Sequence, residues 1–371
     1  MGDFMSNNTI AARSIGGAAT AYNNPFVVNT FNGVIIMKAA RWYKAKDIRV
    51  EHIEEPQVTS GRVKIRVEWT GICGSDLHEY VAGPIFVPVD TPHAVSKEVA
   101  PIVMGHEFSG TVVEVGEGVT SVNVGDLVVV EPILACGKCA TCLKGKYNVC
   151  KYLGFHGLSG GGGGFSEFTV VDERWVHKMP EGLSLEQGAL VEPAAVALHS
   201  VRMSKLKAGD KAVVFGVGPI GLLVIEALKV AGASEIYAVE LSKERGAKAL
   251  ELGATAVINP AEEADVVAKI QELTNGGADV AFEVTGVPMV LKQAIESTSF
   301  EGETIIVSIW EKEASIQPNN IVLSERSVKG IIAYRNIFPA VMDLMKQGYF
   351  SAEKLVTKRI TLDEVVTEGF E

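Results

Sequence analysis

Four cysteines close together in the sequence constrain the fold of this chain more than any other feature. They form a C-x2-C-x2-C-x7-C run at Cys136, Cys139, Cys142 and Cys150. Thiolates this close cannot all pair as disulfides without strain, but they can surround one tetrahedral cation. Four sulfur donors satisfy Zn²⁺ and leave no open position, so we predict a structural zinc site in a lobe at residues 136–150. The alternative, a set of reduced surface thiols, is less favoured because the chain has only five cysteines.

Size and charge narrow the class of protein. With 371 residues and 47% hydrophobic content, the chain can bury a large core, and two domains are expected. A formal net charge of −11 argues against a nucleic-acid-binding surface. No apolar run approaches the roughly 20 residues that span a bilayer. Because the cysteine spacing is typical of metal binding in a reducing compartment, we predict a cytoplasmic protein.

The composition changes twice along the chain. Residues 1–36 are rich in Asn, Ala, Ser and Gly and lack the apolar segment of a secretory signal, so we expect a disordered or artificial extension before Met37. Residues 37–186 consist of short Val/Ile-rich runs separated by Gly, Pro and Asp, which is typical of β-structure. Five consecutive glycines, Gly160–Gly164, have no side chains to pack and predict a loop. A flexible connector and a role in substrate approach are both open for this loop.

Residues 187–334 alternate between strand and helix patterns. Lys211–Phe215 and Glu235–Glu240 are predicted strands, and the apolar spacing over Ile220–Ala231 predicts a helix between them. The alternation continues to residue 309 and predicts a doubly wound parallel sheet, so the fold class is α/β. Residues 335–371 are expected to return to the first domain.

A glycine motif lies at the first of these strand-to-helix junctions. Gly216-Val217-Gly218-Pro219-Ile220-Gly221 is a G-x-G-x-x-G that follows a predicted strand and opens a predicted helix, the context that a dinucleotide site requires. Gly216 permits the tight turn, Gly218 lets the backbone approach a pyrophosphate, and Gly221 lets helix and strand pack closely. The alternative is a glycine turn in an α/β fold that binds no nucleotide.

Glu240 ends the next predicted strand. A carboxylate at this point accepts hydrogen bonds from the ribose hydroxyls and repels a 2′-phosphate, so we predict NAD(H) rather than NADP(H). A solvated glutamate is the alternative, because Arg245 is close in sequence and could meet a phosphate.

A second group of residues has the donors of an open metal site. Cys73 lies outside the four-cysteine run, His106 and Glu107 follow an apolar segment, and Glu192 lies in apolar surroundings. Cys, His and a carboxylate form a three-ligand zinc site with one open position, and an open zinc is a Lewis acid. Each residue alone also fits a core or capping role. Their occurrence together with the four-cysteine run and the glycine motif favours a second metal.

These motifs carry a family resemblance. GICGSDLH, GHEFSG, the four cysteines, LVEPAAVALH and GVGPIG occur in the order found in zinc-dependent medium-chain dehydrogenases, and the resemblance covers nearly all of residues 37–371. It implies a GroES-like catalytic domain at residues 37–186, a Rossmann domain at 187–334 and a return segment at 335–371. The glutamate in LVEP resembles the residue at this position in the polyol branch of the family. VPVDTPHAVSKEVAP and AYRNIFPAVMDLMKQGYFSAEKLVT resemble bacterial (R,R)-2,3-butanediol dehydrogenases.

The resemblance also implies residue roles. Cys73, His106 and either Glu107 or Glu192 would bind a catalytic zinc, while Ser75 takes the alcohol proton and His78 passes it towards solvent. The glycine motif, including Pro219 and Ile220, together with Glu240 and Arg245, would bind NAD. The implied reaction is the NAD(H)-dependent interconversion of (R,R)-2,3-butanediol and acetoin by a homodimer or homotetramer. The alternatives are a sorbitol, other polyol or threonine dehydrogenase, and an NAD-binding protein without catalysis.

Overall fold

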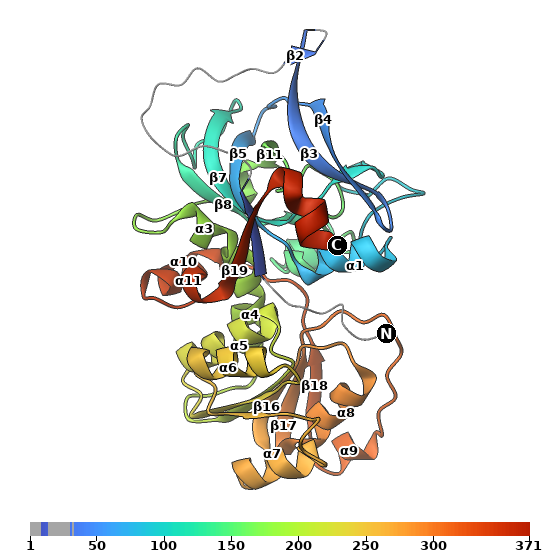
Figure 1. Ribbon diagram of the computed structural model, residues 1–371, viewed down its shortest axis with the longest axis vertical. Helices are drawn as coiled ribbons and strands as arrows, with labels where there is room; N and C mark the ends of the chain where they lie inside the picture. The colour runs from blue at the N-terminus through green and yellow to red at the C-terminus, as the bar shows by residue number, and fades with distance from the viewer. Residues whose placement is uncertain (1–8, 14–29, 32) are drawn as a thin grey trace. The chain divides into compact units, whose positions relative to one another are not determined.

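A computed structural model describes residues 9–13, 30–31 and 33–371 (Figure 1). The chain divides into two compact units. The β-rich unit comprises the described residues up to Glu192 together with Phe338–Glu371, and the α/β unit comprises Pro193–Ile337. The junction at residue 192 lies inside helix α4 (Val191–Met203). The sequence pattern predicted the domain boundary at residue 186.

The β-rich unit is built on a sheet in which β12, β8, β7, β5, β1 and β19 are neighbours in that order, and β11 also pairs with β5. Val63, Ile65 and Val67 of β5 are fully buried and alternate along the strand, as expected when one face of a sheet packs on the core. The strands are β1 (Thr9–Arg13), β5 (Arg62–Gly71), β7 (Glu107–Val115), β8 (Leu127–Val130), β11 (Phe168–Asp172), β12 (Val176–Lys178) and β19 (Val356–Thr361).

Smaller elements complete this unit. A second sheet contains β2 (Thr30–Phe31), β3 (Val34–Lys44), β4 (Asp47–Glu54) and β6 (Ile102–Val103), and β9 (Ile133–Leu134) pairs with β10 (Gly154–Phe155). The helices are α1 (Gly74–Ala82), α2 (Ala140–Leu143), α3 (Leu185–Ala189), α10 (Phe338–Lys346) and α11 (Ala352–Leu355). Because α10, α11 and β19 belong to this unit, the segment after Ile337 returns to it.

The segment expected to be an extension contributes to these sheets. Strand β1 lies between β5 and β19, antiparallel to β5 and parallel to β19. Strand β3 begins at Val34, so Met37 lies within a strand rather than at the start of the folded chain. A segment rich in Asn, Ala, Ser and Gly can still pair, because backbone groups form the ladder. Residues 1–8, 14–29 and 32 lie outside the described part.

The α/β unit confirms the doubly wound sheet predicted from the alternation. Its six strands have the order β15-β14-β13-β16-β17-β18, and all neighbouring pairs are parallel. The strands are β13 (Lys211–Phe215), β14 (Glu235–Val239), β15 (Ala256–Ile258), β16 (Ala278–Glu283), β17 (Thr298–Ile306) and β18 (Ser327–Gly330). The order reverses between β13 and β16, and crevices at such switch points bind ligands in open α/β sheets.

Helices cover both faces of this sheet (Figure 1). Val266, Ile270 and Ala294 pack with Val213 and Phe215 of the sheet in one buried cluster, so α7 and α8 lie on the same face. Helices α5 and α6 pack against each other on the other face (Figure 1). The helices are α5 (Pro219–Ala231), α6 (Lys243–Leu252), α7 (Val266–Thr274), α8 (Pro288–Glu296) and α9 (Asn319–Val322).

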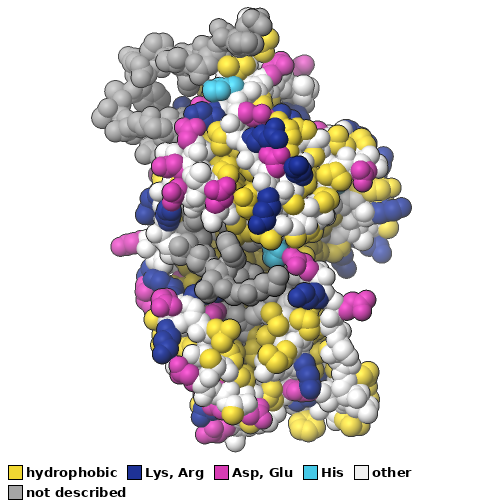
Figure 2. Space-filling model, turned by 45° about the vertical axis from the view of Figure 1, so that its right-hand side comes forward, with side chains coloured by type: hydrophobic (Ala, Val, Ile, Leu, Met, Phe, Trp, Pro, Cys, Tyr) yellow, Lys and Arg dark blue, Asp and Glu magenta, His cyan; other side chains and the backbone are white. Residues whose placement is uncertain are grey.

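The surface carries charges of both signs. On the face shown in Figure 2, Lys and Arg side chains are interspersed with Asp and Glu, and no continuous basic stripe runs across the coloured residues. Within the described part of the chain, no helix is both long and apolar enough to cross a membrane.

Candidate metal and dinucleotide sites

The structure brings Cys73, His106 and Glu107 together in the β-rich unit. Their candidate ligand atoms all lie within 4.8 Å of one another. Cys73 is the N-cap of α1, just after β5, and His106 and Glu107 stand at the start of β7. The antiparallel pairing of these strands matches Gly71 with Glu107, which explains why residues far apart in sequence meet.

Burial opposes charge on both anionic members of this cluster. Burial, with the nearby Glu107, raises the pKa of Cys73 to about 11. Burial, with the nearby Glu192, raises the pKa of Glu107 to about 8. Burial alone would lower the pKa of His106, but Asp76 and Cys73 outweigh it and hold this pKa well above its ordinary value. A divalent cation reverses this preference, because it stabilises the thiolate and the carboxylate. The donor set therefore fits a metal ion.

Asp76 belongs to this site although the sequence did not single it out. Its side chain is fully buried, and Oδ2 accepts a hydrogen bond of 3.0 Å from the backbone N–H of Cys73. Its Oδ1 lies 3.5 Å from Nδ1 of His106, and neither atom has another hydrogen-bond partner. A carboxylate in this position orients a metal-binding imidazole. The available signal was an acidic residue three positions after Cys73, which also fits ordinary capping.

Ser75, His78 and Glu192 surround the three donors in different ways. The Ser75 hydroxyl lies 3.2 Å from Nε2 of His106. His78 is half-buried one turn later in α1. Glu192 is buried in the first turn of α4 and is close enough to raise the pKa of Glu107. Among the described residues, however, Glu107 and not Glu192 completes the set of mutually close ligand atoms.

The four cysteines of the lobe also converge. Their sulfur atoms lie within 4.8 Å of one another, and all five cysteines of the chain are free thiols. The backbone N–H groups of Cys136 and Tyr152 each donate to Sγ of Cys150 at 3.3 Å. The Thr141 hydroxyl, followed by backbone N–H groups, lowers the pKa of Cys139 to about 5. Burial and hydrogen bonds with Cys139 and Cys150 raise the pKa of Cys142 to about 12. Four converging sulfur atoms with amide donors around them are the features of a structural zinc site.

The glycine motif forms the expected turn between β13 and α5. Gly216 has a φ of +84°, and a Cβ at this position would lie 2.5 Å from Cγ2 of Thr285. Gly218 is the N-cap of α5 and Pro219 occupies its first turn, so free N–H groups at this helix start are available to an anion. A Cβ on Gly221 would lie 2.0 Å from the carbonyl oxygen of Gly216, which explains the third glycine.

Glu240 follows β14 and contacts this turn directly. Its Oε2 accepts a hydrogen bond of 3.0 Å from the N–H of Val217, and its Oε1 accepts one of 2.9 Å from Ser242. Arg245 lies 3.8 Å from Oε1 of Glu240. The predicted nucleotide residues are therefore neighbours at the carboxyl edge of the sheet.

The sequence did not single out Glu283, which supports the same edge. This buried carboxylate ends β16 beside Phe215 and accepts hydrogen bonds from the N–H groups of Thr285 and Gly286, at 2.7 and 3.0 Å. It also accepts a hydrogen bond from the Ser308 hydroxyl. Glu283 thus joins two loops next to the glycine turn. An acidic residue at the end of an apolar strand was the signal available in the sequence.

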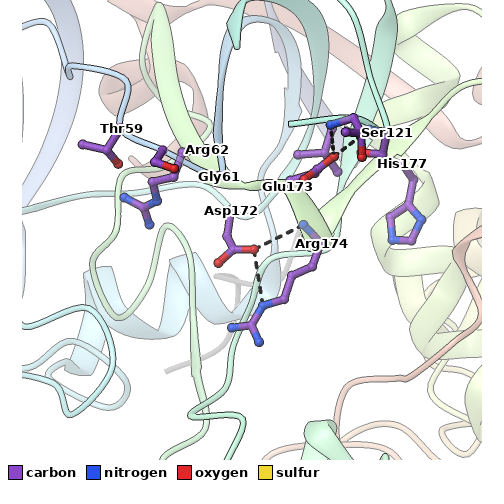
Figure 3. A pocket seen from close by; sticks show the side chains of 11 residues that line it. Thr59, Gly61, Arg62, Ser121, Asp172, Glu173, Arg174 and His177 are labelled. Atoms are coloured by element: carbon purple, nitrogen blue, oxygen red, sulfur yellow. Dashed lines mark hydrogen bonds and ion pairs between the residues drawn. The ribbon is translucent and has the colours of Figure 1, made fainter. Parts of the chain in front are cut away.

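A polar surface pocket of about 890 Å³ in the β-rich unit involves other residues (Figure 3). None of the predicted site residues is among the eleven described residues that line it. Several of its charges are paired with groups of the same pocket: Arg174 lies 3.5 Å from Asp172, and Glu173 accepts hydrogen bonds of 2.6 Å from the N–H groups of Thr120 and Ser121. We therefore assign no ligand to this pocket.

The chain is similar to known proteins over most of its length. The family described as "Alcohol dehydrogenase GroES-like domain" matches residues 59–181, and "Zinc-binding dehydrogenase" matches residues 219–347. The chain is 67% identical over 334 residues to an (R,R)-butanediol dehydrogenase of Bacillus subtilis, covering 90% of this chain and 95% of the relative. It is 47% identical over 337 residues to an (R,R)-butanediol dehydrogenase of Neisseria gonorrhoeae, with coverages of 90% and 95%. A crystal structure of 2R,3R-butanediol dehydrogenase from Bacillus subtilis superimposes with a TM-score of 0.86 at 66% identity, covering 90% of this chain and 95% of the other.

Proposed function

Because the chain belongs to the zinc-binding alcohol dehydrogenase family, we propose (R,R)-2,3-butanediol and acetoin as the alcohol and ketone that this zinc- and NAD-dependent oxidoreductase interconverts. The observation that carries the proposal is the cluster of Cys73, His106 and Glu107, with the hydroxyl of Ser75 only 3.2 Å from Nε2 of the imidazole. A protein that bound NAD without catalysis would have no need of this buried donor set. The substrate pair rests on the similarity to the butanediol dehydrogenases of Bacillus subtilis and Neisseria gonorrhoeae.

Two sets of residues would hold zinc. Cys73, His106 and Glu107 would hold the catalytic ion, with Glu192 near enough to act on Glu107, and the four cysteines of the lobe would hold a structural ion. When bound at the open site, zinc supplies Lewis-acid chemistry that lowers the pKa of an alcohol. Asp76 would keep Nδ1 of His106 directed away from the metal, so that the other ring nitrogen serves as the ligand.

The proton of the alcohol would leave through α1. The Ser75 hydroxyl can accept this proton while it donates its own, and its position beside His106 places it next to the donor set. His78, half-buried one turn later, would carry the proton on towards solvent. A positioned relay of this kind contributes on the order of 10²–10⁴ in rate.

The α/β unit would bind the cofactor. The N–H groups at the start of α5 would face the pyrophosphate, and Glu240 would accept hydrogen bonds from the adenosine ribose. NAD supplies the hydride acceptor when it is bound. The carboxylate of Glu240 also neutralises Arg245 at 3.8 Å, and this pairing disfavours a 2′-phosphate.

A substrate panel tests the proposal. Zinc-loaded enzyme is assayed for NAD reduction with (R,R)-2,3-butanediol, 2-butanol, sorbitol and threonine, and for NADH oxidation with acetoin. We expect the highest kcat/KM for the diol, because a second hydroxyl that finds a buried polar partner is worth about 1–3 kcal/mol. Ser75→Ala should lower kcat by about 10²-fold or more with the zinc content unchanged. Sorbitol or threonine as the best substrate would contradict the assignment.

We also propose that the enzyme is a cytoplasmic homodimer or homotetramer. Among the described strands, β18 forms one edge of the α/β sheet, and exposed apolar side chains, Phe300, Val322 and Leu323, lie in segments that flank it. An open edge with apolar neighbours is suited to pairing with a second copy. The molar mass in solution checks this at micromolar concentration, where a monomer would refute it. Five free cysteines are consistent with a reducing compartment.

A further inference from the structure

The five glycines Gly160–Gly164 are packed against other residues rather than forming an open loop. Gly160, Gly163 and Gly164 are buried, and a Cβ added at any of the five would lie between 2.3 and 3.1 Å from a neighbouring atom. Gly160, Gly161 and Gly162 also have φ values of +89°, +87° and +107°, which side chains disfavour. The run is therefore packed closely against neighbouring segments, and most of its positions exclude a side chain.

The end of the run is hydrogen-bonded to the segment before the metal donors. The N–H of Gly164 donates to the carbonyl of Gly105 at 2.7 Å, and the N–H of Phe165 donates to that of Met104 at 2.9 Å. A Cβ on Gly163 would lie 2.3 Å from the carbonyl oxygen of Met104. Because Gly105 directly precedes His106, these contacts fix the path of the chain as it enters the donor cluster.

Gly164 also packs against two paired residues of β5 and β7, Thr70 and Phe108. A Cβ there would lie 2.6 Å from Oγ1 of Thr70 and 2.9 Å from Cβ of Phe108. Thr70 is near the end of β5, three residues before Cys73, and Phe108 directly follows Glu107 in β7. A side chain on Gly164 would therefore collide with residues that neighbour both donors and displace them.

We propose that Gly163 and Gly164 are positioning residues that set the spacing of Cys73, His106 and Glu107 for metal binding. The inference rests on the proposed zinc site. Metal affinity depends on donor placement within roughly 0.5 Å, and substitution of outer residues that orient ligands weakens binding by about 10–100-fold. The atoms nearest to an added Cβ at any of the five glycines all lie outside the four-cysteine lobe, so the zinc of the lobe should be unaffected by a change there.

Gly164→Ala tests the inference, with Gly302→Ala as the matched control. A Cβ on Gly302 meets a comparable obstacle, Cβ of Thr298 at 2.8 Å, but Gly302 belongs to the α/β unit and the donors to the β-rich unit. Zinc per chain is measured by elemental analysis, and the affinity of the open site by chelator competition. Cobalt substitution adds an absorption spectrum that reports ligand geometry. We expect wild type and Gly302→Ala to hold two zinc ions with the same affinity, and Gly164→Ala to bind the second ion at least 10-fold more weakly with an altered cobalt spectrum.

A rescue variant separates positioning from general damage to the fold. Thr70→Ala removes the atom nearest to the added methyl group, so the double variant with Gly164→Ala should regain part of the lost zinc affinity. It is also the variant to compare with wild type if Gly164→Ala alone does not fold. Equal zinc affinity and identical cobalt spectra for wild type and Gly164→Ala would overturn the positioning role. If Gly164→Ala does not fold, the same equality between wild type and the double variant would overturn it. A single zinc in wild type would instead refute the proposed catalytic site itself.

Discussion

Acidification should destabilise this enzyme through one buried imidazole, that of His156. The side chain is almost completely buried, its Nε2 lies 2.7 Å from Oγ1 of Thr169, and its ring packs on Phe108 at 5.8 Å between centroids. Burial, assisted by the positive charge of Arg62, lowers the pKa of His156 to about 3. The imidazole is therefore neutral in the folded enzyme at any pH where the enzyme works.

The sign and size of the effect follow from proton binding. An unfolded histidine has a pKa of about 6.5, so below that pH the unfolded chain takes up a proton that the folded enzyme does not. Stability is therefore fully present above about pH 6.5 and falls by about 1.4 kcal/mol for each further pH unit, until the folded pKa is reached. Acidification from about pH 7 to about pH 5 should thus remove about 2 kcal/mol through His156 alone.

His156→Gln provides the comparison, because an amide can still bond to Thr169 and does not titrate. Urea unfolding is followed by tryptophan fluorescence at several pH values, since Trp42, Trp69 and Trp175 all lie in the β-rich unit. Between about pH 7 and about pH 5, the wild type should lose about 2 kcal/mol more unfolding free energy than His156→Gln does. Thr169→Val keeps the buried imidazole and should keep the wild-type slope. Parallel curves for wild type and His156→Gln would refute the reasoning.

Three further predictions concern the cofactor and the metals. Glu240→Ser should reduce the preference for NAD over NADP, because it frees Arg245 to bind a 2′-phosphate, and kcat/KM measured with each cofactor checks this. If the unmodified enzyme has equal kcat/KM for NADP and NAD, the role given to Glu240 is wrong. Cys139→Ser should lower the Tm and remove one zinc, while His106→Ala should remove the other zinc and abolish turnover at an unchanged Tm, as elemental analysis and calorimetry would report. In metal-free enzyme, the pKa of about 8 at Glu107 means that stability falls as pH rises from about 4.5 to 8, and Glu107→Gln should flatten that part of the profile. An identical profile for this variant would show that the carboxylate is not buried as described.

The fold of the α/β unit was predictable because its strands are buried on both faces. A run such as Lys211–Phe215, bounded by polar residues and followed by helical spacing, has few alternatives to a parallel strand. The glycine turn follows from the same pattern, since only glycine tolerates both the φ of Gly216 and the approach of Thr285. The hydrophobic periodicity and the glycine turn therefore predict the same strand, turn and helix, and the structure has these elements.

The choice between Glu107 and Glu192 could not be made from the sequence. Both are carboxylates in apolar surroundings, and either could complete a site with Cys73 and His106. The pairing of Gly71 with Glu107 decides which ligand atoms lie together, and strand register is a property of the whole sheet rather than of the motif. Asp76 was missed for a related reason, because its contact with His106 depends on the same register.

The close packing of the glycine run also could not be predicted from the sequence. Five glycines predict an irregular segment with φ values that other residues avoid, and they do not indicate what surrounds that segment. Its neighbours Met104, Thr70 and Thr169 come from three different stretches of the chain. A single sequence contains no signal for such long-range contacts.

The geometry of the cysteine lobe makes loss of its metal hard to reverse in air. Sγ of Cys139 lies 3.9 Å from Sγ of Cys150, and the pKa of about 5 at Cys139 keeps it a thiolate at neutral pH. A thiolate is the form that oxidises, and a second thiol at this distance is ready to close a disulfide with it. Metal stripped without a reductant would therefore leave an oxidised lobe that no longer accepts zinc. After chelation, added zinc should restore the metal content and stability of the enzyme only where its thiols are kept reduced. The stability of the enzyme therefore depends on the redox state of its surroundings.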